Sequence, residues 1–373
     1  MDASRTDAES RTEPASAQAG RFAKVYRVLQ DAVDSRAFPG CAFGILAEGQ
    51  VVLADALGSF TYDQISPVVA PETVFDVASL TKVVATTAIA MVLFQRGELQ
   101  LDLPVGELLP GFVIGRANSE LARRVTIRHL LAHNSGIPGY VEFFRREATA
   151  SGLFRACLGL PVEATPGERS EYSDPGFILL GKALEILNCE SLSATARKEI
   201  FEPLGMTATL FRPPRPRWSE IPPTEIDETF RERRIQGEVQ DENAWVLDGV
   251  AGHAGVFSSV PDLLRFAGGV LAGHNRGSGI FSRETVEVFA QRQAPEGSSR
   301  ALGWDTPSAE SSAGRYFPQH SIGHLGYSGC SLWIDLDASV AAVLLTNRTW
   351  PDRKNNAIRQ VRPRFHDAIR ESL

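Results

Sequence analysis

The strongest constraint on the fold is an apolar segment at residues 75–100, which reads FDVASLTKVVATTAIAMVLFQRGELQ. Its middle is apolar on nearly every side of the predicted helix, so the rest of the protein must cover this helix all round. Two polar residues, Ser79 and Lys82, nevertheless stand at its start. Residues at i and i+3 share a helix face and can touch. They are either ordinary polar residues or a nucleophile and the amine that deprotonates it.

Length and charge limit the class of protein. A chain of 373 residues is long enough for one large domain or two closely packed ones. Its formal net charge of -7 and its scattered arginines argue against nucleic-acid binding. We see no run of about 18 apolar residues, so we expect no membrane span. Residues 1–20 are polar and lack the apolar core of a secretory signal. We predict a disordered tail there and a cytoplasmic location.

Strand patterns lie near both ends of the chain, with helical patterns between them. Residues 21–38 have the spacing of an amphipathic helix, and residues 40–60 read as a hairpin. Strand patterns return after residue 248, and a last helix is expected near residues 355–369. We predict one mixed α/β (α+β) domain after the tail. Its sheet region comprises residues 21–100 and 244–373, and an all-α region is inserted at 101–243. The cleft between them is the expected site, and Trp218 and Trp245 are candidates for lining it.

The placement of Ser79 and Lys82 favours catalysis. Ser79 would profit from the positive end of the helix dipole. Burial is expected to lower the pKa of Lys82, and a neutral amine could then accept the serine proton. The Ser-x-x-Lys spacing is common by chance, so it needs support from elsewhere in the chain.

A second candidate lies in EYSDPGF, at Tyr172 and Asp174. Asp174 could simply be a helix N-cap followed by Pro175 at the first helical position, and Tyr172 could be a packed aromatic residue. Alternatively, a phenol beside an ammonium group can shuttle a proton.

A third candidate is GHLGYSGC, which begins at Gly323. Its glycines weaken a strand unless something approaches the backbone closely, and a substrate carbonyl would be such a group. The N–H of Tyr327 could then pair with that of Ser79 as an oxyanion hole. His324 could bond the substrate or steady the tyrosine.

The ordered set of Ser-x-x-Lys, Tyr-Ser-Asp and His-Leu-Gly resembles the motifs of serine β-lactamases and penicillin-binding proteins. The likeness is closest to class C β-lactamase-related serine hydrolases, which include esterases and D-peptidases. It runs from about Arg21 to the C-terminus. The resemblance implies the β-lactamase-like fold, a mixed sheet with flanking helices and an all-α region.

The resemblance also implies roles for individual residues. Ser79 becomes the acyl-accepting nucleophile, Lys82 its base and Tyr172 the second base, which also acts on the deacylating water. Asp174 occupies the place of the usual asparagine, and His324 that of the usual lysine.

Further roles concern the substrate. Gly326 and Leu325 follow His324 in the third motif, and Leu325 replaces a threonine that family members offer to a substrate carboxylate. The Tyr327 N–H completes the oxyanion hole. A histidine charge that is only partial at neutral pH, the lost threonine and the extra carboxylate of Asp174 together favour a neutral or cationic substrate over a penicillin.

We therefore predict a serine hydrolase that cleaves a small ester, amide or peptide through an acyl-enzyme, without metal or cofactor. A D-alanyl-D-alanine carboxypeptidase, a D-aminopeptidase or a weak β-lactamase is the enzymatic alternative. The non-enzymatic alternative is an inactive ligand-binding homologue. The sequence specifies neither the physiological substrate nor the oligomeric state.

Overall fold

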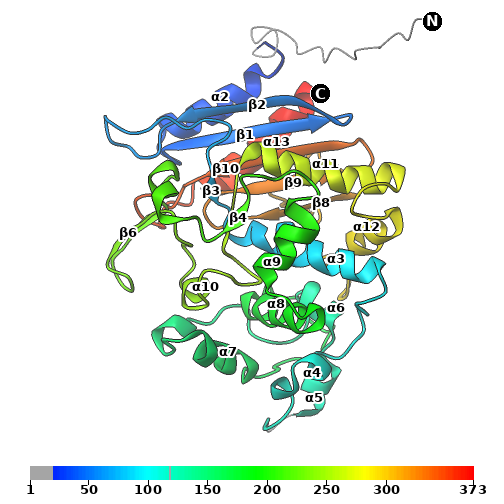
Figure 1. The fold of residues 1–373 in the computed structure, drawn as a ribbon. Coiled ribbons are helices and arrows are strands. Elements are labelled where there is room, and N and C mark those ends of the chain that lie inside the picture. The colour runs from blue at the N-terminus through cyan, green and yellow to red at the C-terminus, as the bar shows by residue number, and fades with distance from the viewer. Residues whose placement is uncertain (1–19, 117–118) are drawn as a thin grey trace, which may run out of the picture.

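A five-stranded antiparallel sheet forms the centre of the protein (Figure 1). The computed structural model describes residues 20–116 and 119–373, so the predicted tail lies outside the described residues except for Gly20. The sheet order is β2-β1-β10-β9-β8. Its strands are β1 (Gly40–Ala47), β2 (Gln50–Gly58), β8 (Ser321–Leu325), β9 (Ser331–Asp335) and β10 (Val340–Thr346). Strands from both ends of the chain share this sheet, and the predicted mixed α/β class is confirmed.

Helices cover both faces of this sheet (Figure 1). The helices are α2 (Ala23–Asp34), α3 (Ala88–Gln95), α4 (Val105–Leu108), α5 (Ser119–Arg124), α6 (Ile127–Leu131), α7 (Ala150–Leu158), α8 (Asp174–Asn188), α9 (Leu192–Ala196), α10 (Glu242–Val246), α11 (Val260–Arg276), α12 (Arg283–Ala290) and α13 (Ile358–Ser372). Side chains of β1 alternate between the faces. Phe43 and Ile45 pack in the cluster under α2 and α13, whereas Ala42 and Leu46 belong to the larger core that includes α11.

The region between the predicted sheet segments is mostly helical, with short strands that we did not expect. β4 (Leu210–Phe211) joins β3 (Phe75–Asp76) and β7 (Val256–Ser258) in a small sheet. β5 (Glu225–Asp227) and β6 (Arg233–Ile235) form a separate hairpin. The predicted domain boundaries stay a prediction.

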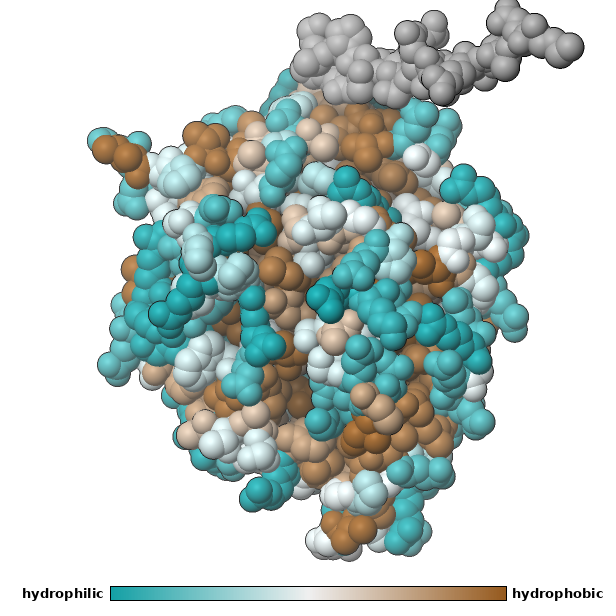
Figure 2. Space-filling model, viewed as in Figure 1, coloured by the Kyte–Doolittle hydropathy of each residue, from teal (hydrophilic) through white to brown (hydrophobic). Residues whose placement is uncertain are grey.

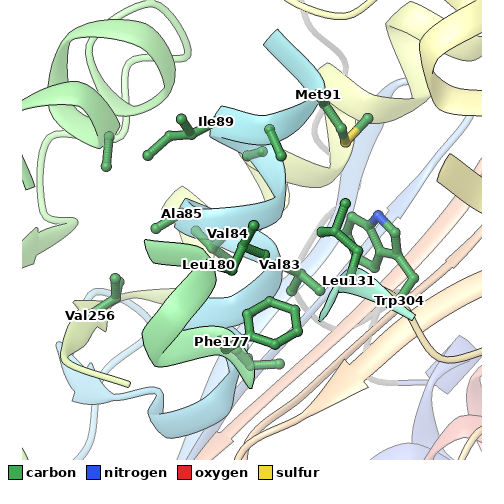
Figure 3. Packing of buried hydrophobic residues seen from close by; sticks show 14 of the residues in the cluster. Val83, Val84, Ala85, Ile89, Met91, Leu131, Phe177, Leu180, Val256 and Trp304 are labelled. Atoms are coloured by element: carbon green, nitrogen blue, oxygen red, sulfur yellow. The ribbon is translucent and has the colours of Figure 1, made fainter. Parts of the chain in front are cut away.

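The predicted apolar helix lies in the core, but it is not one regular α-helix. It begins with a 3-10 turn at Ala78–Leu80, continues as a π-helix at Lys82–Thr87 and ends as α3. Side chains from α6, α8, β7 and the Trp304 segment surround it (Figure 3). A π-helical turn winds wider than an α-helix and often occurs at functional sites.

This central helix is an apolar run of the length that we did not see in the sequence, although it does not follow that it spans a membrane. Residues 78–95 are long and apolar enough to cross a membrane by length and composition, but 83% of that window is buried inside the protein. Hydrophilic residues predominate on the face drawn in Figure 2, and apolar residues form smaller patches between them. The helix is therefore covered by protein, as its pattern requires.

We expect Ile89→Ala to lower the free energy of unfolding by about 2–5 kcal/mol, because Ile89 is only 1% exposed and its truncation leaves a cavity. Urea unfolding followed by circular dichroism would measure the change. The control is Ile186→Ala on α8, where the side chain is exposed and the expected change is below about 0.5 kcal/mol. Equal midpoints for the two variants would contradict the central position of this helix.

Candidate active site

The turn that carries Ser79 is held in an unusual backbone conformation. Ala78, directly before it, has φ of 48°, in the left-handed region that side chains other than glycine rarely adopt. The carboxylate of Asp76 supports this geometry by accepting the Ala78 N–H at 2.8 Å and the Gln240 N–H at 2.7 Å. Such strain persists only where surrounding contacts fix it, and it is frequent at active sites.

Lys82 lies beneath Ser79 and is fully buried. Its Nζ donates to Ser79 Oγ at 3.1 Å, to Asp174 Oδ1 at 2.6 Å and to the carbonyl oxygen of His253 at 3.3 Å. A lysine ammonium has three protons and no acceptor. The three acceptors therefore match a protonated Lys82.

The expected lowering of the Lys82 pKa is wrong in direction. Burial does lower this pKa, but the negative charge of Asp174 and the nearby Tyr172 outweigh burial and raise it above its ordinary value. The prediction rested on burial of the Lys82 amine alone and did not include the carboxylate of Asp174. In the resting state Lys82 is thus an ammonium group, ion-paired with Asp174.

Tyr172 meets Ser79 and Lys82, as the motif order predicted. The Lys82 Nζ lies 4.7 Å from the centre of the Tyr172 ring. Burial raises the pKa of Tyr172, and this rise is opposed by the Lys82 charge and by hydrogen bonds with Lys82 and Ser79. The hydroxyl, the amine and the phenol therefore share one cluster, in which Lys82 is buried and Ser79 and Tyr172 are half-buried.

The start of α8 frees Asp174 for this cluster. Ser173, not Asp174, caps the helix, and its side chain accepts the Gly176 N–H at 3.0 Å. The N-cap reading of Asp174 is therefore wrong. His133 accepts the Ser173 N–H at Nδ1, at 2.9 Å, and the centre of its tilted ring lies 4.6 Å from that of Tyr172. His133 thus helps to position the start of α8 and Tyr172.

His324 lies in the cleft but does not carry the partial charge that we expected. Burial, together with the nearby charges of Lys82 and Arg300, holds its pKa well below the ordinary value, so the ring is neutral at pH 7. Its Nδ1 lies 2.8 Å from the Leu325 carbonyl oxygen, which can only accept, so Nδ1 carries the proton. The Nε2 lone pair is then buried and has no partner among the described residues.

The glycines of the third motif are required by close contacts within the protein, not by a substrate as expected. A Cβ on Gly326 would lie 2.4 Å from the carbonyl oxygen of Val77, two residues before Ser79. A Cβ on Gly323 would meet the side chain of Trp333, on the neighbouring strand β9, at 2.3 Å. The Gly326 contact packs the segment after β8 against the Ser79 turn.

Two arginines hold the turn that presents Tyr327. Arg362, from α13, donates to the carbonyl oxygens of Gly326 at 2.6 Å and Cys330 at 2.8 Å. Arg348 donates to the Tyr327 carbonyl oxygen at 2.8 Å. Sequence reasoning missed both residues, because an isolated arginine far from the motif gives no sequence signal.

A cleft of about 740 Å³ opens over this cluster. Its lining includes all the predicted site residues except Lys82, namely Ser79, Tyr172, Asp174, His324, Leu325, Gly326 and Tyr327. Trp218 and Trp245 do not line it. They border a second hollow beside Arg212 and Gly237, so the expectation for them is wrong.

The beta-lactamase family model matches residues 25–362. The chain belongs to the beta-lactamase family. The match covers most of the chain, and the recognised motifs and the sheet both lie within it. The resemblance inferred from the three motifs is therefore confirmed.

Two curated proteins are similar to this chain over most of its length. A protein of Escherichia coli O157:H7 named "Putative D-alanyl-D-alanine carboxypeptidase" is 29% identical, over 91% of this chain and 85% of its own. The N-acetylmuramyl-L-alanine amidase of Bacillus subtilis is 28% identical, over 83% of this chain and 77% of its own. Among solved structures, the hydrolase EstCE1 superposes with a TM-score of 0.76 at 23% identity, covering 95% of this chain and 100% of that one. This last likeness shows the fold.

Arg300 is a further charged residue of this beta-lactamase-family cleft that the sequence analysis missed. The Arg300 guanidinium carbon lies 5.2 Å from the Tyr172 ring centre, and the side chain pairs only loosely with Asp305, at 3.7 Å. The cleft therefore holds a cation beside Tyr172, although His324 is neutral. The prediction of a neutral or cationic substrate did not include this arginine, because no motif marks it.

We expect Asp174→Asn to shift the acid limb of the kcat/KM profile to lower pH by about 1–3 units. The substitution removes the negative charge of Asp174, which is the main cause that raises the Lys82 pKa. Wild-type activity should rise with pH as the ammonium loses its proton. Because the wild-type Lys82 pKa lies above that of a free lysine, p-nitrophenyl acetate hydrolysis from pH 5 to 10 follows the rising part of the wild-type profile, and kcat/KM of the variant should be higher at each pH. Glu142→Gln, which removes an exposed cleft carboxylate paired with Arg145, is the control. Coincident limbs in the wild type and Asp174→Asn would contradict the role of the ion pair.

Proposed function

We propose that this protein is a serine hydrolase that cleaves small esters or amides through an acyl-enzyme on Ser79. The observation that carries the proposal is the 3.1 Å contact between Lys82 Nζ and Ser79 Oγ on the floor of a cleft. A nucleophile with a base within hydrogen-bond reach is the signature of covalent catalysis. Tyr172 contacts both Lys82 and Ser79 and supplies a second titratable side chain.

Acylation requires the neutral form of Lys82. The amine accepts the Ser79 proton while Oγ bonds to the substrate carbonyl carbon, and the C=O electron pair moves onto oxygen. The N–H groups of Ser79 and Tyr327 stabilise this oxyanion. As the tetrahedral intermediate collapses, the bond to the leaving oxygen or nitrogen breaks. The leaving group then takes a proton from the Lys82–Tyr172 pair.

Deacylation reverses these proton transfers with water as the nucleophile. The Tyr172–Lys82 pair removes a proton from the water as its oxygen attacks the acyl carbon, and returns a proton to Ser79 as the acid departs. Because Lys82, Asp174 and Tyr172 are in contact, the apparent pKa of this step belongs to the cluster and not to one residue.

The family and the room in the cleft for a small substrate support the ester or amide class. Leu325 lines the cleft and can provide an apolar contact. The cytoplasmic location expected from the N-terminal composition stays a prediction.

We expect Ser79→Ala to lose the mass adduct that a fluorophosphonate forms with the wild type, and to reduce p-nitrophenyl acetate hydrolysis at least about 10³-fold. Intact-protein mass spectrometry and a chromogenic assay measure the two effects. The control is Ser328→Ala, which removes the hydroxyl of a buried serine in the turn after β8 and should keep the adduct. If the wild type forms no adduct, the protein is an inactive ligand-binding homologue.

A second candidate function is hydrolysis of a peptide that ends in a free carboxylate, and Arg300 is the observation that favours it. The guanidinium lies beside Tyr172 at the edge of the cluster, and its side chain is only partly buried. A guanidinium binds a carboxylate with two parallel hydrogen bonds. The curated relatives are named for D-alanyl peptides and for a muramyl amide, and these names fit such a substrate.

We expect Arg300→Gln to lower kcat/KM for N-acetyl-D-alanyl-D-alanine about 10–100-fold, because a hydrogen-bonded charge contact is lost. The same substitution should change kcat/KM for the C-terminal amide of that peptide less than about threefold. Parallel assays with both peptides give the comparison. An equal loss on the acid and the amide would assign Arg300 to the support of Tyr172 instead of substrate recognition.

A further inference from the structure

A cluster of two histidines and a glutamate lies outside the catalytic cleft. His274 is in the last turn of α11, Glu287 is on α12, and His320 directly precedes β8. Their ligand atoms all lie within 4.8 Å of one another. His274 Nε2 is 3.1 Å from one carboxylate oxygen of Glu287, and His320 Nε2 is 4.0 Å from the other. None of the three residues lines the cleft.

Hydrogen bonds orient both imidazole rings toward Glu287. His274 Nδ1 lies 3.0 Å from Asn275 Oδ1, and His320 Nδ1 lies 2.7 Å from Asp337 Oδ1. The Asn275 amide nitrogen donates to Ser339 Oγ at 2.7 Å, which leaves its oxygen facing His274. Since the amide and carboxylate oxygens accept, each Nδ1 carries a proton.

In the neutral rings, each Nε2 therefore directs a lone pair toward a carboxylate. Acceptors that face one another repel unless a proton or a cation lies between them. At 4.0 Å, His320 Nε2 is too far from Glu287 for a direct hydrogen bond, so a proton on His274 would link only part of the cluster. A metal ion can link all three side chains.

The donor set selects the class of ion. Two imidazole nitrogens and one carboxylate suit zinc and similar transition metals, whereas calcium and magnesium prefer oxygen ligands. Histidines that bind metals usually donate their other N–H to a carboxylate or another oxygen, as both do here. The side chains of Glu287 and His320 are 47% and 40% exposed, so they can adjust to bond lengths of about 2.0–2.2 Å and leave a position for water.

A second cluster, made of carboxylates alone, differs from this one in its partners. Glu225, Asp227 and Glu242 also lie close together, but Arg231 and Arg353 pair with them. Those carboxylates are already neutralised by guanidinium groups and have no histidine among them. The His274–Glu287–His320 cluster has no such cation among its contacts in the described part of the chain.

We propose that His274, Glu287 and His320 bind one divalent transition metal ion, with zinc the best match. The ion joins the end of α11, helix α12 and the start of the edge strand β8. It is a structural ion, because its ligands are separate from Ser79 and the cleft. The spacing of these three ligands matches no metal-binding motif, so the sequence analysis did not predict the site.

Zinc binding can be measured directly on the full-length chain, after removal of any affinity tag and treatment with EDTA. Titration with Zn²⁺ in competition with a chromophoric chelator should give one site per chain with micromolar or tighter affinity. Glu287→Gln and His320→Ala should each weaken binding more than about tenfold. Both residues are partly exposed, so the variants should fold, which circular dichroism verifies. Glu284→Gln, an exposed carboxylate one turn earlier on α12, is the matched control and should bind as the wild type does.

Thermal melting gives a second readout. Excess Zn²⁺ should raise the Tm of the wild type and of Glu284→Gln by a few degrees, but not that of Glu287→Gln or His320→Ala. If Glu287→Gln and His320→Ala both bind Zn²⁺ as tightly as the wild type, the ion lies elsewhere and the proposal is overturned. Absence of binding to the wild type would also overturn it, and a proton shared by His274 and Glu287 would then explain the geometry. Neither outcome depends on whether Ser79 is catalytic.

Discussion

The buried ammonium group of Lys82 is the charge on which the site and much of the surrounding structure depend. It reaches its three acceptors in three separate segments, namely the Ser79 turn, the start of α8 and the loop at His253. A charge in the interior is tolerated only when it is paired and hydrogen-bonded. Removal of one partner from such a pair typically costs about 3–5 kcal/mol. The same contacts that assemble the catalytic cluster therefore also join the central helix to the helical region.

This arrangement links stability to pH in a definite direction. The folded-state pKa of Lys82 is raised above the unfolded value, so the ion pair stabilises the fold fully below the unfolded pKa. That contribution is lost as the pH rises through the folded pKa. Catalysis has the opposite requirement, because the serine proton needs a neutral amine. The Asp174 carboxylate thus favours the stable ammonium form at the expense of the base.

The sequence predicted the parts of the site that lie in short motifs. Ser79 and Lys82 share a helix face by spacing, and the motif order around Tyr172 and His324 indicated the family. The sheet was predictable as well, because its hairpins have strand-like apolar patterns at both ends of the chain. These features are local, or repeat with the period of a helix or a strand.

Interactions between distant segments could not be predicted. The sign of the Lys82 pKa shift depends on a carboxylate from another helix, and that carboxylate was available only because Ser173 took over the N-cap. Arg300, Arg348 and Arg362 reach the site from isolated positions that match no motif. The π-helical turn below Ser79 also has no marker in an apolar run that fits an α-helix equally well.

The edge strand β8 connects the catalytic cleft with the proposed metal site. His320 precedes the strand and His324 lies near its end, so the two histidines are separated by roughly 13 Å of extended chain. An edge strand has one ladder partner, which here is β9, and β8 gains only a single bridge from Asp305 on its other side. Arg362 and the packing of Gly326 on Val77 fix its cleft end. A metal ion at His320 would fix the opposite end, so both ends of the strand that positions His324 and Tyr327 would be anchored by side chains from helices of the surrounding layers.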